Sequence, residues 1–151
     1  MRRFSSLLAV VCLLPLFASC TVEGSFGPGV VLRFGSAQRL WMSQNLHDYD
    51  FDYRVGCFCP YQGTISVEVR DGLVVAGTTE SGEPLNAEEL AEIPTIPELF
   101  DIARDAFANA DEISVEYHGT LGHPTLISID WYEKMADDEV VYTAKNLEPV
   151  P

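Results

Sequence analysis

The feature that most constrains the fold of this chain is a strictly alternating stretch at residues 48–55. Apolar side chains alternate there with charged ones, in the order Asp48, Tyr49, Asp50, Phe51, Asp52, Tyr53, Arg54 and Val55. Successive side chains of a β-strand point to opposite faces of a sheet, so this period of two predicts a strand with one buried and one hydrated face. We therefore expect a sheet that is covered on one side and open to water on the other.

Similar alternation predicts further strands at residues 64–70, 73–79, 112–118, 125–133 and 139–147. Asp71 and Gly72 separate the first two of these stretches and are typical of the two-residue turn of a β-hairpin. Because the connections between strands are short, the pattern favours antiparallel pairing.

Two main helices are expected beside these strands. Ser36 can cap the first, at residues 36–46, and its apolar face consists of Ala37, Leu40 and Trp41. The second starts with Thr95-Ile96-Pro97-Glu98, which combines a cap, an early proline and a reciprocal carboxylate, and it ends at Asp111. A brief helical turn from Asn86, with Glu89 in the capping-box position, is predicted before it.

The order α-β-β-β-α-β-β-β predicts the α+β class, with an antiparallel sheet and two main helices packed on one face. We assign residues 36–151 to this single domain. The pattern leaves two arrangements open, a single continuous sheet and a duplicated unit of one helix and three strands.

The charge of the chain excludes some partners. Its 151 residues contain 9 Lys and Arg against 23 Asp and Glu. Such an acidic protein is a poor partner for nucleic acid and for acidic membrane surfaces, and a cationic protein is the complementary partner. With 47% hydrophobic residues, the chain is too apolar for a disordered acidic tail.

The N-terminus has the pattern of an export signal. Basic residues at Met1-Arg2-Arg3 precede an apolar stretch at residues 7–18, which is shorter than the roughly 20 residues that span a bilayer. Leu16-Phe17-Ala18-Ser19-Cys20 resembles the lipobox of bacterial lipoproteins. We predict a signal peptide at residues 1–19 and a lipid, including palmitate, on Cys20 that holds the protein on a membrane. The alternative is an ordinary secretory signal.

Residues 20–35 are expected to form a lipidated tether, because glycine and proline interrupt any periodicity there. Thr21 follows the cysteine, and the resemblance to lipoproteins of two-membrane bacteria then implies the outer membrane, facing the periplasm. We therefore predict a location in the cell envelope.

Two further cysteines remain in the predicted mature domain, Cys57 and Cys59. An exported compartment favours their oxidation to a disulfide. In extended chain they lie roughly 6.6 Å apart, at the upper limit for a disulfide, so a bridge requires a kink. A structural bridge or buried pair, a redox pair and a soft metal site all remain open for these two thiols.

Acidic residues offer two more candidates. Asp48, Asp50 and Asp52 project from one strand face and could receive a basic partner or stay solvated. Near the last predicted turn, four residues supply oxygen ligands of the kind that Ca²⁺ requires, although without EF-hand spacing: Asp130, Asp137, Asp138 and Glu139. His47, His118 and His123 share no spacing typical of a zinc site and are interpreted as surface or loop residues.

An ordered set of short motifs resembles an uncharacterised family of bacterial lipoproteins, the domain of unknown function 6174. The resemblance covers roughly residues 41–147 and rests on Trp41, Asp48-Tyr49-Asp50-Phe51, Cys57-Phe58-Cys59-Pro60, Val69-Arg70-Asp71-Gly72, Leu99-Phe100, Tyr117, Gly122-His123-Pro124, Ile129-Asp130 and Asp137-Asp138-Glu139. It implies a similar fold and a membrane anchor, and the family brings no established activity.

No hydrolase, metalloprotease, P-loop or dinucleotide-binding motif occurs in the sequence, so no catalytic residue and no cofactor is expected. The preferred hypothesis is a noncatalytic, membrane-anchored domain that binds a protein or another envelope component. The alternative hypothesis is a thiol redox or metal-handling protein that uses Cys57 and Cys59.

Overall fold

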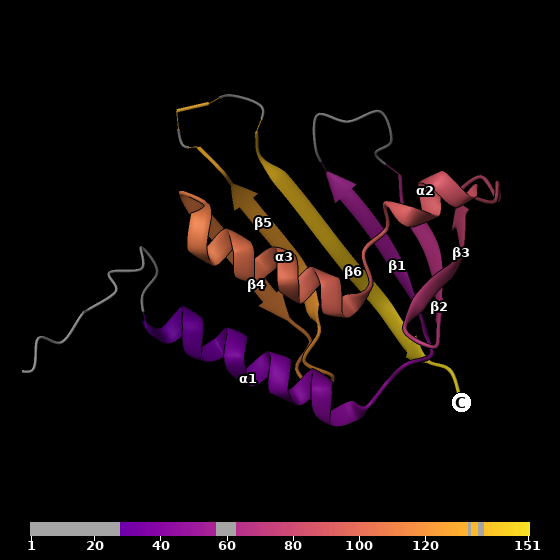
Figure 1. The fold of residues 1–151 in the computed structure, drawn as a ribbon, viewed down its shortest axis with the longest axis horizontal. Coiled ribbons are helices and arrows are strands. Elements are labelled where there is room, and N and C mark those ends of the chain that lie inside the picture. The colour runs from indigo at the N-terminus through magenta and orange to yellow at the C-terminus, as the bar shows by residue number, and fades with distance from the viewer. Residues whose placement is uncertain (1–27, 57–62, 133, 136–137) are drawn as a thin grey trace, which may run out of the picture.

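The computed structural model describes residues 28–56, 63–132, 134–135 and 138–151, and it contains three helices and six strands within them (Figure 1). The helices are α1 (Pro28–Gln44), α2 (Ala87–Ala91) and α3 (Ile96–Asn109). The strands are β1 (Tyr49–Gly56), β2 (Ile65–Arg70), β3 (Leu73–Thr79), β4 (Glu112–Tyr117), β5 (Pro124–Asp130) and β6 (Val140–Pro149). This order confirms the predicted α+β class, with α2 as a short addition.

The strands form one antiparallel sheet in the order β3-β2-β1-β6-β5-β4. β1 and β6 pair at its centre, where Tyr53 lies opposite Ala144 and Asp52 opposite Lys145. The three strands of each sequence half follow the same spatial order, β3-β2-β1 and then β6-β5-β4. The fold is therefore one continuous sheet, and this shared order is also compatible with a duplicated unit of one helix and three strands.

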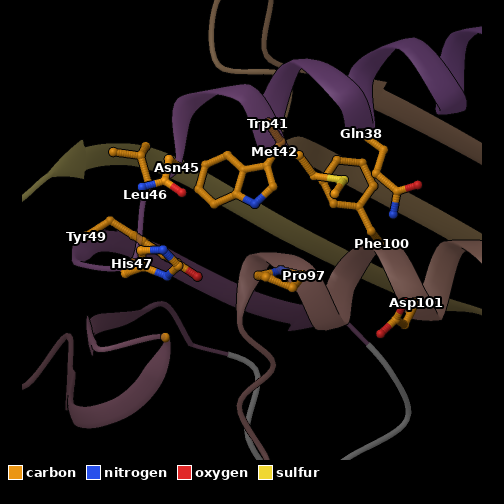
Figure 2. Close-up of a pocket in the computed structure, with 11 residues that line it drawn as sticks. Gln38, Trp41, Met42, Asn45, Leu46, His47, Tyr49, Pro97, Phe100 and Asp101 are labelled. Atoms are coloured by element: carbon orange, nitrogen blue, oxygen red, sulfur yellow. The ribbon is translucent and has the colours of Figure 1, made fainter.

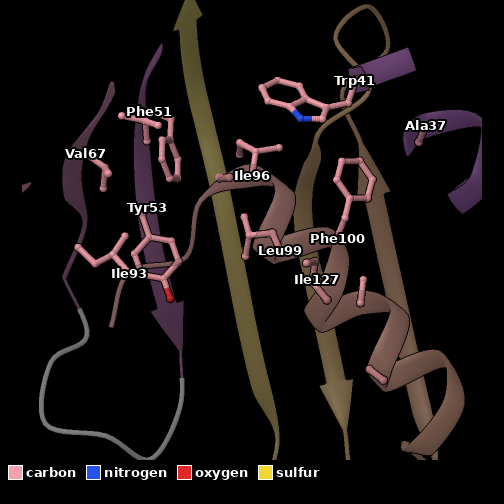
Figure 3. Packing of buried hydrophobic residues seen from close by; sticks show 14 of the residues in the cluster. Ala37, Trp41, Phe51, Tyr53, Val67, Ile93, Ile96, Leu99, Phe100 and Ile127 are labelled. Atoms are coloured by element: carbon pink, nitrogen blue, oxygen red, sulfur yellow. The ribbon is translucent and has the colours of Figure 1, made fainter. Parts of the chain in front are cut away.

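The predicted alternation is confirmed on β1 and on its neighbour β2. Tyr49, Phe51 and Tyr53 are buried, and so are Ile65, Val67 and Val69 on the neighbouring β2. α1 and α3 lie on the same side of the sheet in Figure 1 and pack on this apolar face. Figure 3 shows how the residues of both layers meet, among them Trp41, Phe51, Ile96, Leu99, Phe100 and Ile127.

The turn between β2 and β3 has the predicted conformation. Asp71 and Gly72 both have positive φ angles, 50° and 76°, as a two-residue hairpin turn requires. The Asp48 carboxylate accepts a hydrogen bond from the Asp71 amide at 2.6 Å. Asp48, which directly precedes β1, therefore stabilises this turn.

The predicted helix starts are confirmed at α2 and α3. The Glu89 carboxylate accepts from the Asn86 amide at 2.8 Å, and the Glu98 carboxylate accepts from the Thr95 amide at 2.7 Å. The Tyr49 hydroxyl accepts a further hydrogen bond from the Ile96 amide at 3.1 Å. This last contact joins the N-terminus of α3 to β1.

The predicted start of the first helix is wrong. α1 begins at Pro28 rather than at Ser36, so residues 28–35, which the sequence analysis assigned to the tether, are helical. Ser36 is not a cap, because its hydroxyl donates to the carbonyl of Leu32 one turn earlier. That bond is typical of serine in a helix interior.

The reason for the longer helix is a tertiary contact that local sequence does not contain. The Phe34 ring meets Phe100 and Phe107 of α3 edge to face, with centroids 5.8 and 5.4 Å apart. Each such pair stabilises by about 1 kcal/mol beyond the burial of its area, which offsets the ~1 kcal/mol that Gly35 costs inside a helix.

Gly122 lies where α1 packs tightly against the β4–β5 connection. Its φ is +81°, and an added Cβ would lie 2.5 Å from the Ala37 carbonyl oxygen. Gly122→Ala should therefore lower the free energy of unfolding by about 2–4 kcal/mol, because it adds both a left-handed strain and a clash with α1. Urea unfolding of the full chain measures this change.

Gly119→Ala in the same connection is the matched control. An added Cβ at Gly119 would meet no atom of the described structure within 4 Å, so its unfolding free energy should stay within about 0.5 kcal/mol of the parent. Equal destabilisation by the two variants would contradict the proposed contact.

Candidate functional site

The face of the sheet opposite α1 and α3 carries the charged half of each alternating strand, and we call it the open face. By register, Asp50 and Asp52 of β1 lie opposite Glu68 and Ser66 of β2. Asp50 also lies opposite Glu148 of β6. Pairing therefore brings carboxylates from three strands together, although they lie far apart in sequence.

These residues surround a shallow hollow of about 240 Å³, which we call the acidic hollow. Its carboxylates are Asp50, Asp52, Glu68 and Glu148. Asp52 accepts hydrogen bonds from the Ser66 hydroxyl at 3.1 Å and the Asn146 amide at 2.8 Å. Both donors are neutral, so they orient the carboxylate without cancelling its charge.

One guanidinium reduces the negative charge of the acidic hollow. Arg70 lies 2.6 Å from the Asp50 carboxylate and 3.3 Å from that of Glu68. The hydrogen bond that Arg70 donates to the Asp50 carboxylate raises the pKa of Arg70 further above its usual value. Since all three side chains are partly exposed, these ion pairs contribute little to stability, and their main effect is to order the surface.

A second concavity lies on the helix side, where the C-terminal part of α1 meets the start of α3. It measures about 390 Å³ and is lined mainly by apolar groups, including Trp41, Met42 and Phe100 (Figure 2). Trp41 meets Tyr49 edge to face at 5.4 Å. Burial raises the pKa of Tyr49 to about 12, so its hydroxyl stays protonated and serves the α3 start rather than proton transfer.

His123 lies in the connection between β4 and β5, as expected of a loop histidine, but it is not a surface residue. Its side chain is 1% exposed, and its ring stacks on His118 with centroids 4.9 Å apart and an interplanar angle of 12°. The Trp41 ring meets the His123 ring edge to face, with centroids 6.0 Å apart. The pattern Gly122-His123-Pro124 carries no local sign of this burial, which results from the approach of α1.

The buried imidazole predicts an acid-sensitive fold. Burial, and then the neighbouring His118, lower the pKa of His123 to about 4 from an ordinary value of 6.5. The unfolded chain therefore binds this proton below about pH 6.5, whereas the folded protein does so only near pH 4, and the free energy of unfolding falls across that window as pH is lowered.

We expect His123→Phe to reduce the pH dependence of urea unfolding between about pH 6.5 and pH 4, because phenylalanine binds no proton. The exposed His47 provides the control, since His47→Gln should retain the slope of the parent. Identical slopes for the parent and His123→Phe would exclude His123 as the source of acid sensitivity.

The structure describes only some of the other site residues that the sequence predicted. Cys20, Cys57, Cys59 and Asp137 lie outside the described residues. Asp130, at the end of β5, is described together with Asp138 and Glu139, which precede β6. Within the described ranges, no group of three or more His, Cys, Asp or Glu side chains could hold a metal ion.

The fold and the open face define a small α+β domain with one helix-covered and one hydrated sheet face. Residues 33–149 match a family described as Family of unknown function (DUF6174), and the chain belongs to this family. No protein with a curated description and no solved structure matches the chain. Among the described residues, no helix combines the length and apolar character needed to cross a membrane.

Proposed function

We propose that this protein is a noncatalytic binding domain, anchored to a cell-envelope membrane through a lipid on Cys20, that binds a cationic protein or another positively charged envelope component. The location that fits this role is the outer membrane, with the domain facing the periplasm. The proposal combines the lipobox resemblance at residues 16–20 with the chemistry of the open face.

The observation that carries the proposal is the acidic hollow. Four carboxylates from β1, β2 and β6 surround it, whereas Arg70 is the guanidinium that pairs with two of them. Asp52 accepts hydrogen bonds from two neutral donors, and Lys145 of β6 lies opposite it in the strand register. Such a surface attracts cationic partners over a distance of about one Debye length, ~8 Å at physiological salt.

The helical start of α1 shortens the proposed tether. Only residues 21–27 separate the predicted lipidation site from Pro28. A segment of this length spans at most about 25 Å when fully extended. The anchor would therefore keep the domain close to the membrane surface, where it meets partners in the envelope rather than distant ones.

Cys20→Ala should abolish lipid attachment, because only the cysteine thiol can carry the proposed lipid. Incorporation of an alkyne-tagged palmitate in cells, followed by fractionation of the membranes, measures this loss. Cys12→Ala is the control and should incorporate the label like the parent, since Cys12 lies within the predicted signal peptide. Label retained by the Cys20→Ala variant would refute the anchor.

The open face is tested with a photo-crosslinking amino acid at Thr78, an exposed position on the border of the acidic hollow. We expect a defined adduct in cells that Asp52→Asn combined with Glu148→Gln reduces at least about fivefold, because a charge pair at a protein interface contributes on the order of 1 kcal/mol or more.

The matched control removes the same number of charges elsewhere. Glu88→Gln combined with Glu92→Gln changes exposed residues of α2 and its C-terminal cap, away from the acidic hollow. This pair should leave the adduct unchanged. An adduct that responds equally to both double variants, or to neither, would show that the open face does not bind the partner.

A further inference from the structure

We propose that the outer edge of β4 binds an extended segment of the cationic partner as an added strand, and that this segment alternates basic and apolar residues. The inference rests on the proposed function in one respect, that the partner is a cationic protein. It goes beyond that function because it names the mode of binding and the sequence pattern of the bound segment.

The two ends of the sheet differ. At β3, the following segment returns along the edge, where the Thr79 amide donates to Glu83 and the Leu85 amide donates to Gly77, both at 2.9 Å. At the other end, β4 pairs with β5 alone in the described part of the chain. An edge strand presents the amide and carbonyl groups of alternate residues outward, and a further strand can pair with them.

A groove beside β4 can receive one row of side chains from such a strand. It measures about 430 Å³ and lies between α1, which contributes Ala37 and Leu40, and β4, which contributes Val115 and Tyr117. The groove is also lined by Arg33, Ser36, Glu116 and His118. The groove therefore offers apolar side chains from both α1 and β4 to one row of an incoming strand, with polar groups beside them.

Charge determines which face of the added strand is basic. Glu112, Ser114 and Glu116 are the exposed residues of β4, and they project on the open face. Residues directly opposite on a neighbouring strand approach within about 5 Å, where opposite charges stabilise and like charges destabilise the pair. Arg33 lies on the α1 wall of the groove, so lysine is disfavoured on that side and apolar residues are preferred there.

The same two glutamates argue against a second copy of this chain as the occupant. In an antiparallel pairing of two β4 strands centred on Ser114, Glu112 of each copy would face Glu116 of the other. Charged side chains on edge strands are a known protection against such self-pairing. A basic partner removes the repulsion that a second copy would create.

The test uses the full chain in detergent micelles and a capped heptapeptide that alternates lysine and valine. Calorimetry at ~0.15 M salt limits nonspecific attraction between the charges. Two further peptides carry N-methyl groups on alternate backbone nitrogens, one set for each edge of the peptide strand. We expect the parent peptide to bind, one methylated version to lose at least tenfold in affinity, and the other to bind like the parent.

Variants of the protein locate the binding. Glu112→Lys combined with Glu116→Lys should weaken binding at least tenfold, whereas Glu88→Lys combined with Glu92→Lys makes the same charge change on and beside α2 and should not. Amide hydrogen exchange should slow in β4 when the peptide is bound and should stay unchanged in β3.

Failure of this inference is distinct from failure of the proposed function. Absence of binding, equal binding of both methylated peptides, or insensitivity to the Glu112 and Glu116 changes would overturn the edge-strand inference. Binding that is lost instead with Asp52→Asn and Glu148→Gln would also overturn it, while supporting the acidic hollow as the site. The crosslink from Thr78 tests the proposed function without reference to β4.

Discussion

The pairing of β1 with β6 is the interaction on which the rest of the structure depends. It joins the first strand to the last and converts two three-stranded meanders into one sheet. Each meander alone would present an apolar face too small to cover both helices. At the junction Ala144 is almost completely buried, and Figure 3 shows Ile96 and Leu99 of α3 in front of β6. α3 thus packs across the centre of the sheet and covers both halves.

The two faces of this sheet serve different purposes. One face contributes its aromatic and aliphatic residues to the core, and with them the groups that tie the helices in place, such as the Tyr49 hydroxyl at the start of α3. The other face carries the charged residues, whose side chains are not needed for packing. Because the charged face lies outside the core, its chemistry can vary without loss of the fold, which suits a role in binding.

Both proposed binding modes follow from this division. The acidic hollow depends on the register of β1 with its two neighbours, since Glu68 and Glu148 approach Asp50 only through pairing. The β4 edge depends on the end of the sheet and on α1, which forms one wall of the groove. The stacked pair of His118 and His123 lies in the connection that follows β4, where Gly122 leaves room for the close approach of α1.

Much of the fold could be predicted from short patterns. The alternation at residues 48–55, the turn at Asp71 and Gly72, and the capping box at Asn86 each depend on a few consecutive residues, and each is confirmed. The aspartates of the candidate site were also visible in the sequence. Their neighbours were not, because Glu68, Glu148 and Asn146 reach the acidic hollow only by strand pairing.

The sequence by itself determined the type and order of the elements, the two-sided character of the sheet and the acidic charge of the chain, because these depend on residue type and local spacing. Tertiary structure alone decided the central place of β1 and β6, the start of α1 at Pro28 and the burial of His123. The physical reason is the same in each case: contacts between residues far apart in the chain outweighed local preferences of about 1 kcal/mol.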